Sequence, residues 1–255
     1  MELMDGIVSA WEFNQNSKDS TSLANGSDVG KMTYNFGNVV GKRCAVFNGT
    51  SYILVGELSD YAFIHNTGVF SVEFWCKFTT VAVTEYMMGN TPTSVEKGFY
   101  FGKTNTGSIT FVISNGAGAL ILSFTRTSFF TDTNWHHVVV TGNYPKNTSQ
   151  FYKDGIPFGI PQAFSNPPAT GNQTRQLAVG TINWTTPLSL TMNGSLDRVR
   201  IWNKELSADE IYRLYNNRKG LDFPFVTNAF NGFPRGVQKE SANGFPNMYD
   251  GNGFN

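Results

Sequence analysis

The chain has 255 residues, of which 40% are hydrophobic and 15% charged, and it contains 26 glycines and 22 phenylalanines. This composition suits a β-rich globular protein and excludes a coiled coil or a wholly disordered chain. The formal net charge is zero, so no surplus of basic residues exists to neutralise phosphates, and nucleic acid is not an expected partner. No stretch reaches the roughly 18 apolar residues that a membrane span requires.

The amino-terminal stretch MELMDGIVSAWEF has acidic residues near its start and no apolar segment of the kind found in signal peptides. We therefore expect no secretion signal. Cys44 and Cys76 lie in strand-like runs. One disulfide between them is arithmetically possible, but we expect two buried free thiols, since nothing else indicates an oxidising compartment.

Short alternating patterns separated by Gly, Asn, Asp and Pro turns occupy residues 1–221. In SVEFWCKF, which spans 71–78, the even-numbered residues are apolar and would share one face of a strand. Further runs follow at hairpin spacing, and the pair Asp154 and Gly155 between two of them is a strong hairpin signal. No helical pattern separates the strands, so the spacing predicts an all-β, antiparallel sandwich rather than parallel βαβ units.

One short helix is expected after the last strand. Ser207 is placed to cap it, and Glu210 at the third position completes a capping box. Leu206 before the cap and Ile211 after it are spaced to form a hydrophobic staple. Such a helix is marginal in isolation, so its apolar face, which includes Leu214, must pack on the sandwich.

Residues 222–255 form a second region, in which Gly, Asn, Pro and Phe dominate and the sequence NGFP occurs twice. Two interpretations remain open. The region is either a disordered tail or an extended C-terminal arm that orders against a partner chain or its own domain. Its six phenylalanines favour the arm, because disordered segments are poor in aromatic residues.

Several motifs occur in a specific order along residues 6–217. They are IVSAWEFN, KDSTSLANG, GKRCAVFNGTSYILV, FSVEFWCKF, NWHHVVVTGN, FYKDGIPFG, LAVGTIN and NGSLDRVRIWNKELSADEIYRLYNN. Together they resemble the laminin G-like, concanavalin A-like lectin/glucanase superfamily in its pentraxin-type jelly-roll branch. The resemblance implies a jelly-roll β-sandwich whose first and last strands are neighbours, with the short helix following the last strand.

Catalysis is not expected, although the superfamily includes glucanases. Glycoside hydrolysis needs two carboxyl groups about 5–9 Å apart, and glucanase relatives place them at alternate positions of one strand, yet no Glu-x-Asp occurs here. His136 and His137 are adjacent in a strand and would point to opposite faces, while His65 lies in a loop-like segment. We predict that the protein is not an enzyme. His137 resembles a family position that packs structurally, and we expect a structural role for it.

The resemblance also implies a structural calcium ion as the possible cofactor. By position, its ligands would be Glu12 or Asn14, the carbonyl of Gly49 and the carboxylate of Asp197, since calcium prefers oxygen ligands. We expect Asp197 to face the core, where a carboxylate needs a partner. A metal is one such partner, and backbone amides or Arg43 are the alternatives.

Lectin-like members of the superfamily bind sugars by aromatic stacking and a few polar groups on loops. Tyr86, Tyr100 and Trp184 are predicted loop or loop-edge aromatic residues and are our candidates for ligand binding. The remaining tryptophans lie in strand patterns and are expected to be packing residues: Trp11, Trp75, Trp135 and Trp202.

Two functions are compatible with the sequence. The first is a non-enzymatic structural or adhesion protein of a virus particle, such as a phage decoration, head-fibre or tail-fibre component. It would be made in the host cytoplasm, form a homo-oligomer or array, contact other virion proteins through its arm, and expose the sandwich to surface glycans. The missing signal and the reduced cysteines motivate it. The alternative is a soluble, non-viral carbohydrate-binding lectin module, located outside the cell.

Overall fold

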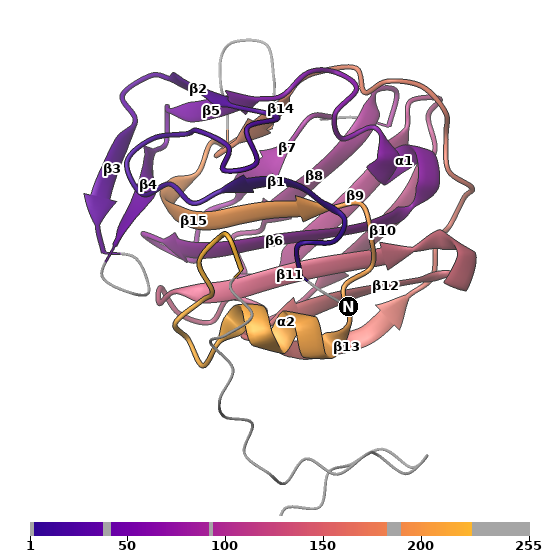
Figure 1. Cartoon of the computed structure of the whole chain (residues 1–255). Helices are drawn as coiled ribbons and strands as arrows, with labels where there is room; N and C mark the ends of the chain where they lie inside the picture. Colours follow the sequence, from indigo (N-terminus) through magenta and orange to yellow (C-terminus); the bar gives the residue numbers. More distant parts are fainter. Residues whose placement is uncertain (1–2, 38–41, 92–93, 183–189, 226–255) are drawn as a thin grey trace, which may run out of the picture. The chain divides into compact units, whose positions relative to one another are not determined.

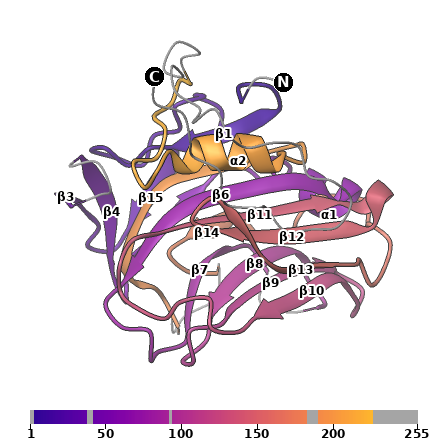
Figure 2. The ribbon, with the colours of Figure 1, turned by 90° about the horizontal axis from the view of Figure 1, so that it is seen from below.

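A computed structural model of the chain describes residues 3–37, 42–91, 94–182 and 190–225. Within them two antiparallel sheets stack face to face (Figures 1 and 2). Sheet A has the order β13 (Ile156–Gln162), β12 (Thr148–Lys153), β11 (His136–Asn143), β6 (Val69–Phe78), β15 (Asn193–Trp202), β4 (Arg43–Asn48) and β3 (Thr33–Phe36), and β1 (Ile7–Trp11) also pairs with β15. Sheet B has the order β10 (Leu120–Arg126), β9 (Ile109–Asn115), β8 (Lys97–Lys103), β7 (Glu85–Gly89), β14 (Leu177–Val179), β5 (Tyr52–Val55) and β2 (Gly26–Val29).

This arrangement confirms the predicted all-β antiparallel sandwich. The position of β1 beside β15, with Ala10 opposite Arg200, agrees with the arrangement that the resemblance implied. The Asp154 and Gly155 turn joins β12 to β13, and both residues have positive φ values, 52° and 83°. Such a turn matches the right-handed twist of the strands it connects.

The inner faces of the two sheets form a core rich in phenylalanine. Alternate residues of each strand point inward, so Phe74 of β6 reaches across to Phe101 of β8, with ring centroids 5.2 Å apart. Phe101 in turn packs on Phe111 of β9 at 4.6 Å. Cys44 and Cys76 are buried free thiols, as the sequence predicted.

The predicted helix is α2 (Ala208–Tyr215), and it carries the expected capping box. The Ser207 hydroxyl accepts a hydrogen bond from the Glu210 backbone N–H, while the Glu210 carboxylate accepts one from the Ser207 N–H at 2.8 Å. Ile211 and Leu214 are fully buried in a cluster with Trp202 of β15. The helix therefore covers the outer side of sheet A (Figure 2).

A second short helix, α1 (Phe63–Thr67), and a 3₁₀ turn, Tyr144–Lys146, were not predicted. Helix α1 has only five residues and no side-chain cap, so it leaves no pattern in the sequence. It ends at Gly68, which has a φ of 66°, a left-handed conformation that glycine adopts without steric cost. No helix in the described part of the chain is long and apolar enough to cross a membrane.

The first compact unit of the chain extends to Phe225. Phe225 stacks on Trp202 of β15, with nearly parallel rings 6.4 Å apart, and Phe223 packs edge-on against Phe225. The start of the predicted arm thus belongs to the sandwich. The rest of the arm, residues 226–255, lies outside the described residues.

Candidate functional site

The outer face of sheet A is covered by helix α2, by Leu3 and by the segment that follows α2 (Figure 2). Trp75 of β6 stacks on Tyr215 of α2 with an interplanar angle of 13°. The indole N–H of Trp202 donates to the Leu3 carbonyl at 2.9 Å. These two tryptophans and Trp11 are buried, as predicted, whereas Trp135 is only partly buried.

A network of charged side chains is buried on this covered face. Arg200 is fully buried and binds both carboxylate oxygens of Glu12 at 2.8 and 3.0 Å. It also contacts Glu73 at 3.2 Å, and Glu73 lies 3.1 Å from the His137 ring. Burial would lower the pKa of Arg200, but Glu12 and Glu73 outweigh burial and raise it. Arg200 thus has two carboxylate partners, and one of them, Glu73, also contacts the His137 ring.

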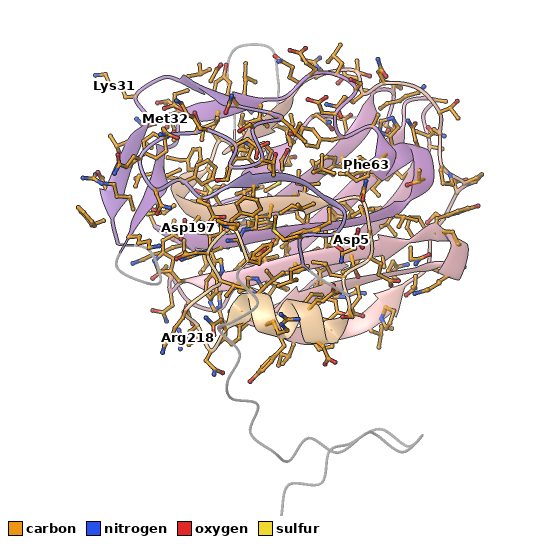
Figure 3. All side chains as sticks on the ribbon, viewed as in Figure 1. Asp5, Lys31, Met32, Phe63, Asp197 and Arg218 are labelled. Carbon is orange, nitrogen blue, oxygen red and sulfur yellow. The ribbon has the colours of Figure 1, made fainter. Side chains whose placement is uncertain are left out.

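Asp197 does not face the core, contrary to the sequence-based expectation (Figure 3 labels it on β15). Asp197 pairs across the sheet with Trp75, an outer-face residue, while Val199 belongs to the core. The strand has a bulge between Asp197 and Arg200, and Arg198 within it has a φ of 48°. A bulge inserts an extra residue and shifts the alternation, so simple counting placed Asp197 on the wrong face.

Two of the predicted calcium ligands, Glu12 and Asp197, bind arginine side chains. Glu12 binds Arg200, and the Asp197 carboxylate lies 2.7 Å from Arg198 Nη1. In the described ranges, no three His, Cys, Asp or Glu side chains are grouped as metal ligands. Both carboxylates of the predicted set therefore have guanidinium partners. Calcium binding stays a prediction, and a melting temperature that a chelator leaves unchanged would contradict it.

The outer face of sheet B is different, because no described helix or strand covers β8, β9 and β10 on that side (Figure 2). Cross-strand pairing arranges its outward residues in two rows. The first row is Tyr100, Val112 and Ser123, and the second is Tyr86, Gly102, Thr110 and Thr125. We call the side chains of these rows the tyrosine face: Tyr86, Tyr100, Thr110, Val112, Ser123 and Thr125.

The two tyrosines of this face meet at a right angle. Their ring centroids are 5.5 Å apart with an interplanar angle of 87°, and both are partly buried. A Cβ on Gly102 would lie 3.3 Å from the Tyr86 ring, so the absent side chain makes room for that ring. Both tyrosines were predicted as loop or loop-edge residues, and the structure places them within strands β7 and β8.

The tyrosine face combines aromatic surface with hydroxyl groups and carries no charged side chain. Burial raises the pKa of both Tyr86 and Tyr100, so their phenols stay protonated and can donate hydrogen bonds. The Thr110 and Thr125 hydroxyls lie 2.8 Å apart on neighbouring strands. These threonines were not predicted as site residues, although their alternation with Phe111 and Phe124 indicates an outward face.

Trp184, the third predicted ligand residue, lies outside the described residues. The described residue Leu190 accepts a hydrogen bond from the Tyr86 N–H at 2.7 Å through its backbone carbonyl.

Two shallow hollows occur elsewhere on the described surface. One of about 250 Å³ is lined by Leu23, Asn25, Leu54, Glu57 and Asp60 among others, and one of about 360 Å³ by Tyr144, Phe164 and Pro167 among others. Neither hollow includes Tyr86 or Tyr100.

Comparison with known proteins identifies a family and a fold. A family model described as the concanavalin A-like lectin/glucanases superfamily matches residues 47–212. Domain 4 of AbnA, a GH43 extracellular arabinanase from Geobacillus stearothermophilus, in complex with arabinotriose, aligns with a TM-score of 0.61 at 16% identity, covering 81% of this chain and 97% of that one. No curated protein sequence matches the chain.

Receptor-binding domains of botulinum neurotoxins share the fold as well. The domain of the mosaic serotype C/D aligns with a TM-score of 0.64 at 16% identity, covering 85% of this chain and 52% of that one. The type G domain aligns with a TM-score of 0.61 at 12% identity, covering 84% and 52%. The chain thus spans about half the length of these toxin domains.

Proposed function

The chain belongs to the concanavalin A-like lectin/glucanases superfamily, and from this premise we propose that it is a non-catalytic carbohydrate-binding protein whose binding site is the tyrosine face. The observation that carries the proposal is the Tyr86 and Tyr100 pair on the uncovered side of sheet B. Aromatic rings offer apolar area with a polar tip, which suits a sugar ring with C–H groups on its faces and hydroxyls at its rim. The arabinanase domain of the same fold is described in complex with arabinotriose, which supports this ligand class.

The ligand that the face fits is a neutral oligosaccharide laid across the strands. None of the six side chains of the tyrosine face is charged, so an acidic glycan would gain no partner there. Strands lie about 4.8 Å apart, and β7 to β10 therefore span about 14 Å, enough for a few sugar units. The exposed Ser123 and Thr125 of β10 continue the platform beyond the tyrosines as hydroxyl partners.

The residue types of the tyrosine face also favour binding over hydrolysis. A glycosidase needs a carboxylic acid and a carboxylate beside the scissile bond, and the tyrosine face contains neither. The nearest acidic residue in sequence, Glu85, points to the interior and is only 2% exposed.

The proposal is tested by glycan-array screening of the full chain, followed by titration calorimetry with the best neutral oligosaccharide. We expect Tyr86→Ala and Tyr100→Ala each to weaken binding by about tenfold, since an aromatic contact contributes on the order of 1 kcal/mol beyond its buried area. Tyr212→Ala is the matched control, because Tyr212 is 41% exposed but lies on α2 beyond the other sheet. A double tyrosine variant that binds as tightly as the unaltered protein would refute the site.

The finer role as a virus-particle component stays a prediction, and the comparisons lend it no support. Three further expectations also stay predictions: the homo-oligomeric or arrayed state, the contacts with virion proteins through residues 226–255, and the virion or extracellular location. Recovery of the chain only within assembled particles would favour the viral role. Recovery as a free glycan-binding protein would favour the lectin module.

A further inference from the structure

A buried lysine and glutamate lie directly behind the tyrosine face, on the inner side of the same two strands. Lys103 of β8 is fully buried, Glu85 of β7 is 2% exposed, and the two residues are cross-strand partners. Lys103 Nζ lies 3.7 Å from Glu85 Oε2. Neither residue belongs to the tyrosine face.

The ammonium group of Lys103 is surrounded by backbone carbonyls of a single loop. It donates to the carbonyls of Thr80 and Val81, both at 3.3 Å, and to the carbonyl of Val83. The ring of Phe78 lies below it, with its centroid 4.8 Å from Nζ. An ammonium has three N–H donors, and here each has a carbonyl from the segment 80–83.

This set of carbonyl oxygens with one carboxylate is the donor chemistry that proteins use to hold a hard cation. Here a side chain supplies the positive charge. Burying two charges costs several kcal/mol per ion before their attraction is counted, and an apolar pair at these positions would avoid that cost. We therefore explain the Lys103 and Glu85 pair by the backbone segment that it holds in position rather than by its contribution to stability alone.

On each of the two strands, the buried residue is adjacent in sequence to a residue of the proposed binding site. Glu85 precedes Tyr86, and Lys103 follows Gly102. Consecutive strand residues point to opposite faces, so the inner pair and the outer Tyr86 ring over Gly102 share the same stretch of backbone. Glu85 Oε1 also accepts the Asn193 N–H at 3.2 Å, which ties this stretch to the start of β15.

We propose that Lys103 is a positioning residue of the binding site, whose ammonium replaces a structural cation and holds segment 80–85 so that Tyr86 stays in place beside Tyr100. Removing the side chain beyond Cβ leaves three carbonyls and one carboxylate around an empty position. That position is a site for a small primary ammonium ion. The effect on glycan binding rests on the proposed function, whereas the ammonium site does not.

The test uses the full chain with Lys103→Ala and n-propylammonium, which supplies the three carbons and the nitrogen that the substitution removes. We expect the variant to melt lower than the unaltered protein, and n-propylammonium to raise its melting temperature in a saturable way. Tetramethylammonium, which has no N–H donor, and neutral n-propanol should not do so. If Lys103→Ala does not fold, the yield of folded protein on refolding with n-propylammonium is the measurement.

Lys153→Ala is the matched control. Lys153 also donates to a carbonyl, that of Phe129, and lies over the Phe129 and Phe158 rings, but it belongs to β12 of sheet A. Its variant should show no response to n-propylammonium beyond that of the unaltered protein. An equal response in both variants, or no response in Lys103→Ala, would overturn the ammonium site.

The positioning role has a separate measurement in the nuclear Overhauser contact between the Tyr86 and Tyr100 rings. We expect this contact to weaken in Lys103→Met, which keeps the bulk but loses the charge, and glycan affinity to fall by about tenfold or more. In Lys103→Ala, n-propylammonium should restore both. Unchanged ring contacts in Lys103→Met would refute positioning, even where the tyrosine variants confirm the glycan site. Conversely, recovery of the ring contacts in a protein that binds no glycan would uphold the positioning and reject only the proposed function.

Discussion

The two outer faces of the sandwich differ in how far other segments of the chain cover them. On sheet A, Trp75, Trp202 and Arg200 are 1% exposed or less, because α2, Leu3 and the segment up to Phe225 cover them. On sheet B, Ser123 and Thr125 are exposed and no described helix or strand covers β8 to β10. One face holds the ends of the described fold in place, and the other remains available.

The two outer faces also differ in their charged residues. The covered face concentrates its charged residues in ion pairs around Arg200, whereas the tyrosine face has none. Buried ion pairs require well-defined partners, so they define where the covering segments dock. An uncharged platform of hydroxyls and rings imposes no such single partner. The ion pairs of Arg200 therefore stabilise the covered face, and the uncharged outer face of sheet B is the one that we propose for binding.

The largest expected effect is that of Arg200→Met on stability. The substitution leaves Glu12 and Glu73 buried without their main partner, and breaking a buried pair in this way costs about 3–5 kcal/mol. Urea unfolding should show this loss in the free energy of unfolding. Glycan affinity at the tyrosine face should stay unchanged in the fraction that remains folded.

Ser123→Ala on the open face is the control for this measurement, since exposed substitutions usually change stability by less than about 0.5 kcal/mol. A triple variant with Arg200→Met, Glu12→Gln and Glu73→Gln should regain part of the lost stability, because no charge is then left unpaired. Should Arg200→Met cost no more than Ser123→Ala, the ion pairs do not hold the covered face.

Much of the fold was predictable because local chemistry dictates it. The even-numbered apolar residues of SVEFWCKF predicted the inward face of β6. Asp154 and Gly155 predicted a hairpin, and Ser207 with Glu210 predicted the start of α2. Each of these signals lies within a few residues. Helix α1 was missed because its five residues have no cap and no repeat.

The site was only partly predictable, because it depends on pairing between distant strands. Tyr86 and Tyr100 were selected as aromatic candidates, but nothing local indicates that their rings meet. Asp197 was assigned to the wrong face because a bulge at Arg198 breaks the alternation, and no residue type in a strand marks a bulge with certainty. The buried position of Lys103 depends on carbonyls some twenty residues away, so composition alone would place it in solvent.

The next expected effect is that of Ser207→Ala, which removes the cap of α2. Loss of an N-cap hydroxyl costs about 1 kcal/mol, and α2 is the main helix covering sheet A. Urea unfolding of the full chain measures the loss. Hydrogen exchange should show faster opening of α2 with no change in β8 and β9. Equal acceleration on both sheets would mean that the two faces are not independent.

The smallest expected effect is acid-dependent and concerns Asp222, at the end of the covering segment. Burial would raise the pKa of Asp222, but hydrogen bonds from Lys42 and Arg198 outweigh it and lower the pKa below its ordinary value of 3.8. A carboxyl with a lowered pKa in the folded state stabilises the protein above its unfolded pKa and loses that contribution as pH falls through the folded pKa. Because the Asp222 side chain is 49% exposed, we expect at most about 1 kcal/mol.

Asp222→Asn should therefore be slightly less stable than the unaltered protein at pH 7, and the difference should shrink below about pH 4. Urea unfolding across pH 3 to 7 measures both curves. Asp28→Asn on β2 of sheet B is the control: its carboxylate accepts a hydrogen bond from Tyr34 at 2.7 Å but forms no ion pair among the described residues. A difference between Asp222→Asn and the unaltered protein that stays constant down to pH 3 would show that the ion pairs of Asp222 do not hold the segment before Phe225 to sheet A, and that its apolar contact with Trp202 suffices.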